Sequence, residues 1–168
     1  MDVGIAPWEV WVRSTWLAEF VLTYGWTWPL FEILHYIGLV LLLASVGLFD
    51  LRVLGWVNGI APSALHRLVP FGVAGFAINA LTGLAFFAGF PEQYAYNPAF
   101  QLKLLFMLLA GMNIVVFYTA IFRRLQELPA DADAPALAKL ITGISLTSWL
   151  IVLIAGRLIT FYRPPFSH

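Results

Sequence analysis

Residues 29–49 read PLFEILHYIGLVLLLASVGLF, and this stretch decides the fold class. A helix needs about 20 consecutive, mainly apolar residues to cross the roughly 30 Å hydrocarbon core of a bilayer. The stretch is long enough, and Glu32 and His35 are its only side chains that ionise near neutral pH. Its apolar residues run continuously instead of alternating, which excludes a transmembrane β-strand. Residues 29–49 are therefore predicted to form a membrane-spanning helix.

Three further apolar runs have the same character, at residues 68–90, 99–122 and 140–162. The whole chain is 61% hydrophobic and 11% charged, whereas an ordinary soluble domain carries roughly 25% charged residues. A soluble fold of this size has too little interior to hide so much apolar surface. The sequence predicts an all-α integral membrane protein, with a four-transmembrane-helix bundle formed by residues 29–168.

Residues 1–28 form a different segment, a Trp-rich arm that holds five of the seven Trp residues. Trp prefers the headgroup region of a membrane. Within this arm, residues 7–24 place apolar side chains on one helical arc and Glu9 and Arg13 away from it. We expect an amphipathic helix lying along the membrane interface; an irregular interfacial arm is the alternative.

Composition also limits the partners. The net charge is zero, so nucleic acid is not an expected partner. Cysteine is absent, which excludes disulfides, Cys-ligated zinc, iron–sulfur clusters and thiol catalysis. The expected partners are membrane lipids and, through the aromatic arm, other membrane subunits.

The Lys and Arg residues of the connections predict the orientation. The first and third connections carry five of them, and the arm, second connection and tail carry three. Cytoplasmic loops are the more basic ones, so both ends are predicted to lie outside a bacterial inner membrane. The two groups are Arg52, Arg67, Arg123, Arg124 and Lys139, against Arg13, Lys103 and Arg163.

A layer of polar side chains is predicted in the outer third of the bundle, one or two from each helix. Ionisable groups inside a membrane are costly and therefore candidates for function. The inner half offers little polar chemistry beyond Tyr118. The predicted ligand-binding residues of the layer are Glu32, His35, Thr82, Lys103 and Arg157.

Such a layer carries net positive charge and suits an anionic lipid headgroup or a quinone carbonyl. Haem is a further candidate cofactor, with His35 as a single axial ligand, because His66 lies at the opposite end of the bundle and cannot share the haem. The plainer alternatives are a buried, hydrogen-bonded His35 and a Lys103 that reaches toward the headgroups. Arg157 shares a stripe with Leu146, Leu150 and Leu153, and it needs a partner if that stripe faces the core.

Other chemistry has less support. Glu32 and His35 form half of a di-iron motif, but a second half is missing, so no metal site is predicted. No Ser lies near the layer, and without a nucleophile–base pair no catalytic residue or enzyme activity is predicted. Asp50 and Arg52 are expected to form a local ion pair. Asn79 and Asn113 are expected to make hydrogen bonds between helices.

Four parts of the chain carry a resemblance: LFEILHYIGLVLLLASVGLFDLRVLGW, LTGLAFFA, YNPAFQLKLLFMLLAGMN, and Trp149 with Arg157. They resemble a family of small bacterial four-helix integral membrane proteins of unknown function, over roughly residues 28–162. The resemblance implies a fold and no activity. More distantly, the chain is similar to copper-resistance and cytochrome b561-type bundles, but it lacks paired histidines at one depth and the Met and His richness of a copper conduit. The family resemblance singles out His35, Asp50, Arg52, Asn97, Pro98, Lys103 and Asn113.

Three functions follow from these observations. The first is a membrane protein, associated with redox chemistry or not, that binds a small ligand in the outer polar layer. The second is a structural or accessory subunit of a larger membrane complex. The third is a small transporter, which the apolar inner half and the lack of an inverted repeat disfavour.

Overall fold

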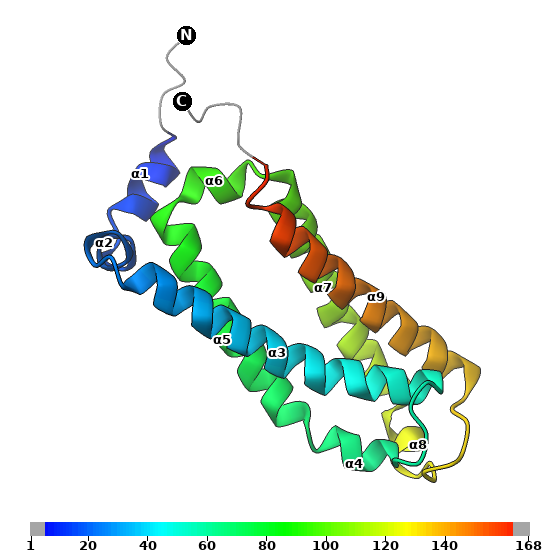
Figure 1. The fold of residues 1–168 in the computed structure, drawn as a ribbon. Coiled ribbons are helices and arrows are strands. Elements are labelled where there is room, and N and C mark those ends of the chain that lie inside the picture. The colour runs from blue at the N-terminus through cyan, green and yellow to red at the C-terminus, as the bar shows by residue number, and fades with distance from the viewer. Residues whose placement is uncertain (1–5, 163–168) are drawn as a thin grey trace.

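The chain folds into helices only, over the residues that the computed structural model describes, 6–162. Four long helices form two crossing pairs, and short helices connect or precede them (Figure 1). In chain order the helices are α1 (Pro7–Arg13), α2 (Trp16–Thr23), α3 (Thr27–Leu54), α4 (Pro62–His66), α5 (Val69–Gly89), α6 (Pro91–Ala95), α7 (Pro98–Ala120), α8 (Phe122–Gln126) and α9 (Ala136–Leu158).

The four predicted spans correspond to four stretches that are long and apolar enough to cross a membrane: α3, α4 with α5, α7, and α9. The first is longer than predicted, because α3 begins at Thr27 and ends only where Gly55 adopts a left-handed conformation (φ 88°). Residues 1–5 and 163–168, including Arg163, lie outside the described residues.

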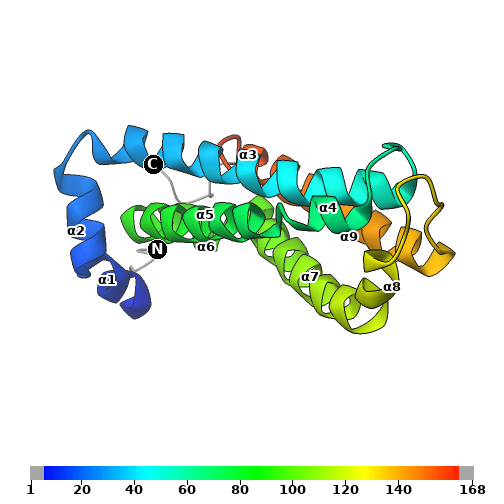
Figure 2. The same ribbon diagram turned by 90° about the horizontal axis from the view of Figure 1, so that it is seen from below.

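The long helices pack as two pairs, α3 with α5 and α7 with α9, and the contact of α3 with α9 joins them. The backbones of α5 and α7 lie apart through most of their length (Figure 2). We call the end with α1, α2 and α6 the arm end, and the end with α4, α8 and residues 55–61 and 127–135 the loop end. Figure 1 shows α3 and α9 apart at the arm end and side by side at the loop end.

Close backbone contact holds α3 against α5. A Cβ atom on Gly75 would lie 2.5 Å from the carbonyl oxygen of Gly38, and one on Gly38 would lie 2.8 Å from the carbonyl oxygen of Gly75. Small residues permit this approach in membrane helices. Asn79 donates to the Gly75 carbonyl of its own helix (3.0 Å), so its predicted hydrogen bond between helices is wrong, whereas Asn113 of α7 does donate to Ile141 of α9 (3.1 Å).

The Trp-rich arm is helical, but it forms α1 and α2 instead of one helix. The break falls at Ser14 and Thr15, where the Thr15 hydroxyl accepts from Ala18 N and caps α2. α2 packs on α5, with Val21 against Gly89, and Arg13 forms an ion pair with Glu92. The arm therefore packs against the arm end of the bundle instead of extending away from it.

Candidate functional site

The predicted polar layer is partly assembled at the arm end. His35 of α3 and Thr82 of α5 form a direct hydrogen bond, with 2.7 Å between Nδ1 and Oγ1. The Thr82 hydroxyl donates its one hydrogen to the carbonyl of Ile78 (2.7 Å). With the Thr82 hydrogen on that carbonyl, a neutral His35 would donate through Nδ1 and keep Nε2 as its acceptor nitrogen. A histidine oriented in this way can accept a hydrogen bond or ligate a metal through Nε2.

Lys103 of α7 lies against α9 at the same end of the bundle as His35 and Thr82. Its side chain runs over Gly156, where a Cβ atom would lie 3.7 Å from Nζ. Among the described residues, neither ion pair includes Lys103. We call His35, Thr82 and Lys103 the arm-end cluster.

Glu32 and Arg157 do not join that cluster directly. Both are exposed; Glu32 accepts from the Trp28 indole (3.1 Å), and Arg157 donates to Thr160 and lies over the Phe161 ring. Burial, with a smaller contribution from the Glu32 carboxylate, raises the pKa of Tyr94 on α6 to about 12, so Glu32 lies toward α6.

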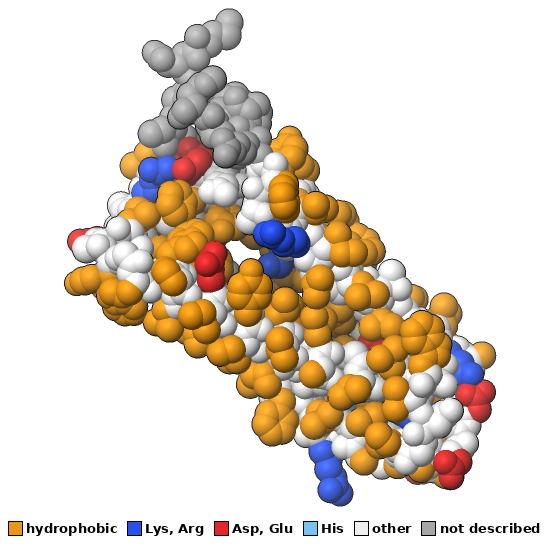
Figure 3. Space-filling model, in the orientation of Figure 1, with side chains coloured by type: hydrophobic (Ala, Val, Ile, Leu, Met, Phe, Trp, Pro, Cys, Tyr) orange, Lys and Arg blue, Asp and Glu red, His pale blue; other side chains and the backbone are white. Residues whose placement is uncertain are grey.

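The stripe that ends in Arg157 faces outward, since Leu150 and Leu153 are exposed. Arg157 therefore needs no partner in the core. Figure 3 shows the molecule hollowed between α3 and α9 at the arm end, with basic and acidic side chains at opposite edges of the hollow.

The loop-end half of the bundle contains a cavity of about 330 Å³. It lies between α3, α5, α7 and α9, with His66 of α4 at its edge. Most of the wall is apolar or aromatic, for example Leu42, Phe49, Phe76, Met107, Phe117 and Trp149. Polar side chains also line it, which corrects the prediction of an apolar inner half; they include Ser45, Asp50, Asn113, Thr142 and Ser145.

Two buried polar atoms at this cavity lack a partner. Asp50 is 3% exposed and Trp149 is 5% exposed, yet Asp50 Oδ2 and Trp149 Nε1 make no hydrogen bond. Ser145 of α9 is the polar neighbour of the Asp50 carboxyl. Most buried polar atoms in native proteins have a hydrogen-bond partner, so each exception calls for an explanation.

Arg52 does not pair with Asp50, which corrects the predicted ion pair. Residues two apart on a helix do not face each other. Arg52 is 1% exposed and donates instead to backbone carbonyls of both connections at the loop end. It bonds Ile60 (2.6 Å) in one connection, and Pro129, Ala130 and Ala132 in the other.

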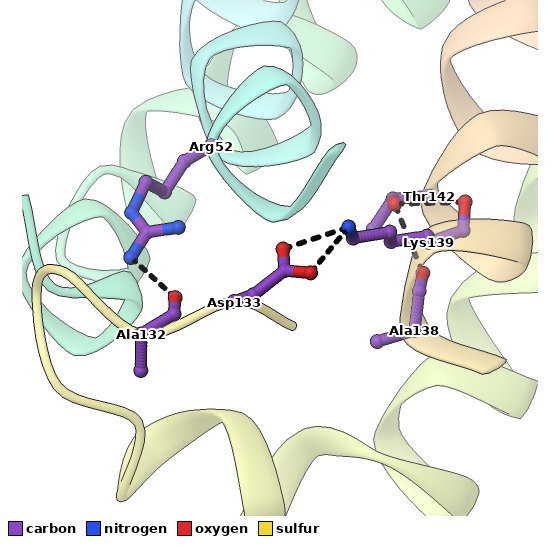
Figure 4. A network of polar contacts seen from close by, with 6 residues as sticks. All are labelled: Arg52, Ala132, Asp133, Ala138, Lys139 and Thr142. Atoms are coloured by element: carbon purple, nitrogen blue, oxygen red, sulfur yellow. Dashed lines mark hydrogen bonds and ion pairs between the residues drawn. The ribbon is translucent and has the colours of Figure 1, made fainter. Parts of the chain in front are cut away.

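Figure 4 shows one of these bonds beside the exposed ion pair of Asp133 with Lys139 (2.7 Å). The hydrogen bond from Lys139 lowers the pKa of Asp133. Arg52 and this ion pair fix the connection that closes the loop end next to the cavity.

At the edge of the cavity, His66 of α4 and Tyr118 of α7 are hydrogen-bonded, with 3.0 Å between Nε2 and Oη. This bond joins the two helix pairs where their backbones diverge. Neither residue contacts the arm-end cluster, because both lie at the loop end. A haem shared by His35 and His66 therefore stays excluded, and single ligation by His35 stays a prediction.

Two features of the sequence point to polar groups at the cavity and are independent of the arm-end polar layer. The spacing of Asp50 and Arg52 already rules out their pairing on one helix. In α9, Thr142, Ser145 and Trp149 are three and four residues apart and share a face, which the structure turns inward. A polar stripe of this kind on an apolar helix predicts a polar feature in the bundle interior.

Comparison of the chain with protein families, with curated proteins and with solved structures finds no match. The resemblance drawn from the sequence motifs therefore stays a prediction, and the function must be argued from the two sites themselves.

Proposed function

We propose that this chain is a multi-pass membrane protein of the bacterial inner membrane that binds a small ligand at the arm-end cluster. The four long apolar helices support membrane insertion. The ligand would enter the hollow between α3 and α9, which faces the outer leaflet if both ends lie outside. The class proposed is a molecule with acceptor oxygens, such as a quinone or an anionic lipid headgroup.

The observation that carries this proposal is the environment of Lys103. Its side chain is partly buried between helices, and no carboxylate among the described residues pairs with its ammonium. A buried charge without a partner is costly in a membrane. An acceptor group on a ligand would offset that cost through a charge-assisted hydrogen bond. Thr82 meanwhile holds the His35 ring through Nδ1, which leaves Nε2 free for a ligand.

The test uses protein purified in a mild detergent, from which bound quinones and lipids are extracted and quantified. We expect one quinone or anionic lipid per chain in the wild type and at least a tenfold lower yield in Lys103→Gln. The matched control is Lys139→Gln, because Lys139 is exposed to solvent in a loop-end ion pair. Equal yields from the two variants would refute a role of Lys103.

Absorption spectra of the same samples test the haem alternative. A Soret band that shifts on reduction and is lost in His35→Ala would make haem the ligand. A colourless sample with no stoichiometric quinone or lipid would count against the arm-end site and favour the second candidate function.

That second candidate is an accessory subunit of a larger membrane complex. The observation that favours it is the exposure of α7. Only 6% of the residues in its most apolar stretch are buried within the chain. Its neighbour α5 lies apart from it, so one side of the bundle is open. Co-purification of a fixed set of membrane proteins at constant ratio would support this function.

A further inference from the structure

The loop-end cavity is a second feature that suits a ligand, separate from the arm-end cluster. Its volume of about 330 Å³ lies at the lower end of the roughly 300–1,000 Å³ range of small-molecule sites. Such sites are mostly apolar, with a few polar groups that orient the ligand. This cavity has that composition, because its apolar walls hold only a few polar atoms.

Two of those polar atoms lack partners among the described residues. Asp50 Oδ2 and Trp149 Nε1 are buried and make no hydrogen bond there. A buried donor or acceptor without a partner costs about 1–3 kcal/mol, and more for a charged group. Both side chains line the same cavity. A cationic group on a ligand could offset the cost of the buried Asp50 carboxylate, whereas the Trp149 N–H would need an acceptor of its own.

No cation in the described part of the chain compensates the Asp50 carboxyl group, so its ionised form would be an unpaired negative charge at the cavity. Asp50 is the only acidic residue among the described residues that line it. Arg52, the nearest cation in sequence, donates its guanidinium hydrogens to loop carbonyls. The Nε2 atom of His66 is hydrogen-bonded to Tyr118. Neither ion pair of the described residues includes Asp50.

Aromatic rings line the same cavity as this carboxyl group. Phe49, Phe76, Phe117, Tyr118 and Trp149 all line the cavity. The faces of aromatic rings attract cations, and aromatic cages recognise quaternary ammonium groups. A carboxylate together with several rings is the environment that a lipophilic ammonium ion prefers. We propose that the loop-end cavity binds a small lipophilic ammonium compound, with its cationic nitrogen at Asp50 and its apolar body against the aromatic wall.

The route into the cavity fits a lipophilic ligand. Several lining residues on α5 and α7 are also exposed at the molecular surface: Val73, Phe76, Ile114 and Tyr118. They mark an opening between the two helices whose backbones diverge. That opening lies along the apolar flank of the bundle, so a compound dissolved in the bilayer could enter sideways.

This proposal is independent of the proposed function. The arm-end cluster offers a cation to a ligand with acceptor oxygens, and the loop-end cavity offers a carboxylate to a cation. The two sites draw on different residues at opposite ends of the bundle. Asp50→Asn should therefore leave the yield of quinone or lipid unchanged, and Lys103→Gln should leave cation binding unchanged.

The test is equilibrium dialysis of detergent-solubilised protein against benzyltrimethylammonium, with protein-free micelles as the blank. Neopentylbenzene is the matched neutral probe, because a carbon atom replaces the ammonium nitrogen and the shape is kept. We expect saturable binding of one cation per chain. In Asp50→Asn, the Kd of the cation should rise at least tenfold, while the Kd of neopentylbenzene should change less than twofold.

The control variant is Asp131→Asn, which neutralises an exposed carboxylate in the α8–α9 connection and should bind both probes like the wild type. An Asp50→Asn variant that binds the cation as tightly as the wild type would overturn the proposal. Should this variant fail to fold, the wild type alone decides, since it must bind the cation at least tenfold more tightly than the neutral probe. Equal affinity for the two probes, or no saturable cation binding, would overturn the proposal as well.

Discussion

Asn97 joins the start of α7 to the end of α9 through one fully buried side chain. Its Oδ1 accepts from Ala99 N and Phe100 N and so caps α7, while its Nδ2 donates to the carbonyls of Ile159 and Tyr162. The amide oxygen and the amide nitrogen both make hydrogen bonds, and no other side chain of similar size provides this acceptor and this donor together. The arm end of the α7–α9 pair depends on this residue.

Two substitutions separate the roles of Asn97. Asn97→Ser keeps an N-cap oxygen but cannot reach α9, and Asn97→Ala loses both contacts. Removing an N-cap costs about 1 kcal/mol, and leaving a buried carbonyl without its donor costs about 1–3 kcal/mol. We expect both variants to lose unfolding free energy in detergent, with Asn97→Ala about 1 kcal/mol below Asn97→Ser. Equal values for the two variants would show that the cap adds nothing here.

A separate prediction concerns the effect of Arg52 on stability. Arg52→Met keeps the apolar stem but removes the donors that hold the two loop-end connections. We expect a loss of about 2–4 kcal/mol, because several partly buried carbonyls lose a charged donor together. Arg52→Lys should recover only part of it, since a lysine lacks the planar fork of the guanidinium. Thermal unfolding measures both variants.

The control for Arg52 is Arg124→Met, at an exposed position of α8. Surface substitutions of this kind usually change stability by less than about 0.5 kcal/mol. A loss in Arg52→Met no greater than in this control would contradict the bracing role of Arg52.

At this scale the sequence predicted some contacts and missed others for a clear reason. Depth along a helix follows from residue number, so the sequence predicts one layer for His35, Thr82 and Lys103, and the structure brings His35 and Thr82 into contact. Rotation about the helix axis does not follow from it. That is why Arg157, predicted to need a partner in the core if its stripe faced inward, is exposed, and why Asp50, predicted to pair with Arg52, faces a cavity instead.

Among the contacts between helices, the α3–α5 contact leaves little space for a side chain at its glycines. A Cβ atom on Gly75 would lie 2.5 Å from the Gly38 carbonyl oxygen and 2.7 Å from Leu42 N, whereas one on Gly83 would meet nothing within 4 Å. The sequence predicts close packing along Gly75, Asn79 and Gly83. The structure confirms it at Gly75 and not at Gly83, which does not face a neighbouring helix closely.

Alanine substitutions test this contact with a control on the same helix. Gly75→Ala should destabilise the protein by about 1–3 kcal/mol, the usual cost of overpacking, because backbone atoms must move to admit the methyl group. Gly83→Ala should be neutral or slightly stabilising, since alanine favours a helix over glycine. Unfolding by a denaturing detergent in mixed micelles measures both variants. Equal effects at the two positions would show that the close contact is not what holds α3 to α5.

The helix ends show what local sequence can and cannot predict. Asn97-Pro98 starts α7 as its capping pattern indicates, and the predicted third span misses the α7 bounds by only one or two residues. The arm was harder, because α1 and α2 are both amphipathic and only the Thr15 cap separates them. Local chemistry fixes such ends, whereas the pairing of the long helices depends on contacts distant in sequence.

For the whole molecule, the gap between the two helix pairs, where α5 and α7 lie apart, is the property that no single stretch of sequence reveals. Hydropathy predicts four spans but not which of them touch. The structure joins α3 with α5 and α7 with α9, and the divergence of α5 from α7 opens the loop-end cavity. The arm-end cluster and the loop-end cavity lie at opposite ends of this one packing arrangement, and no ion pair of the described residues includes Lys103 or Asp50.

The orientation of the whole molecule is the last prediction, and the absence of cysteine makes it simple to test. Single cysteines are introduced as Gly25→Cys at the arm end and Asn58→Cys at the loop end, both exposed positions between helices. The basic residues Arg67, Arg123 and Arg124 lie at the loop end, and basic loops stay in the cytoplasm. A membrane-impermeant maleimide added to intact spheroplasts should therefore label the Gly25→Cys variant and reach the Asn58→Cys variant only after lysis. The reverse pattern would place the loop-end cavity nearer the outer face and the arm-end cluster nearer the cytoplasm. Labelling of both variants before lysis would contradict membrane insertion itself.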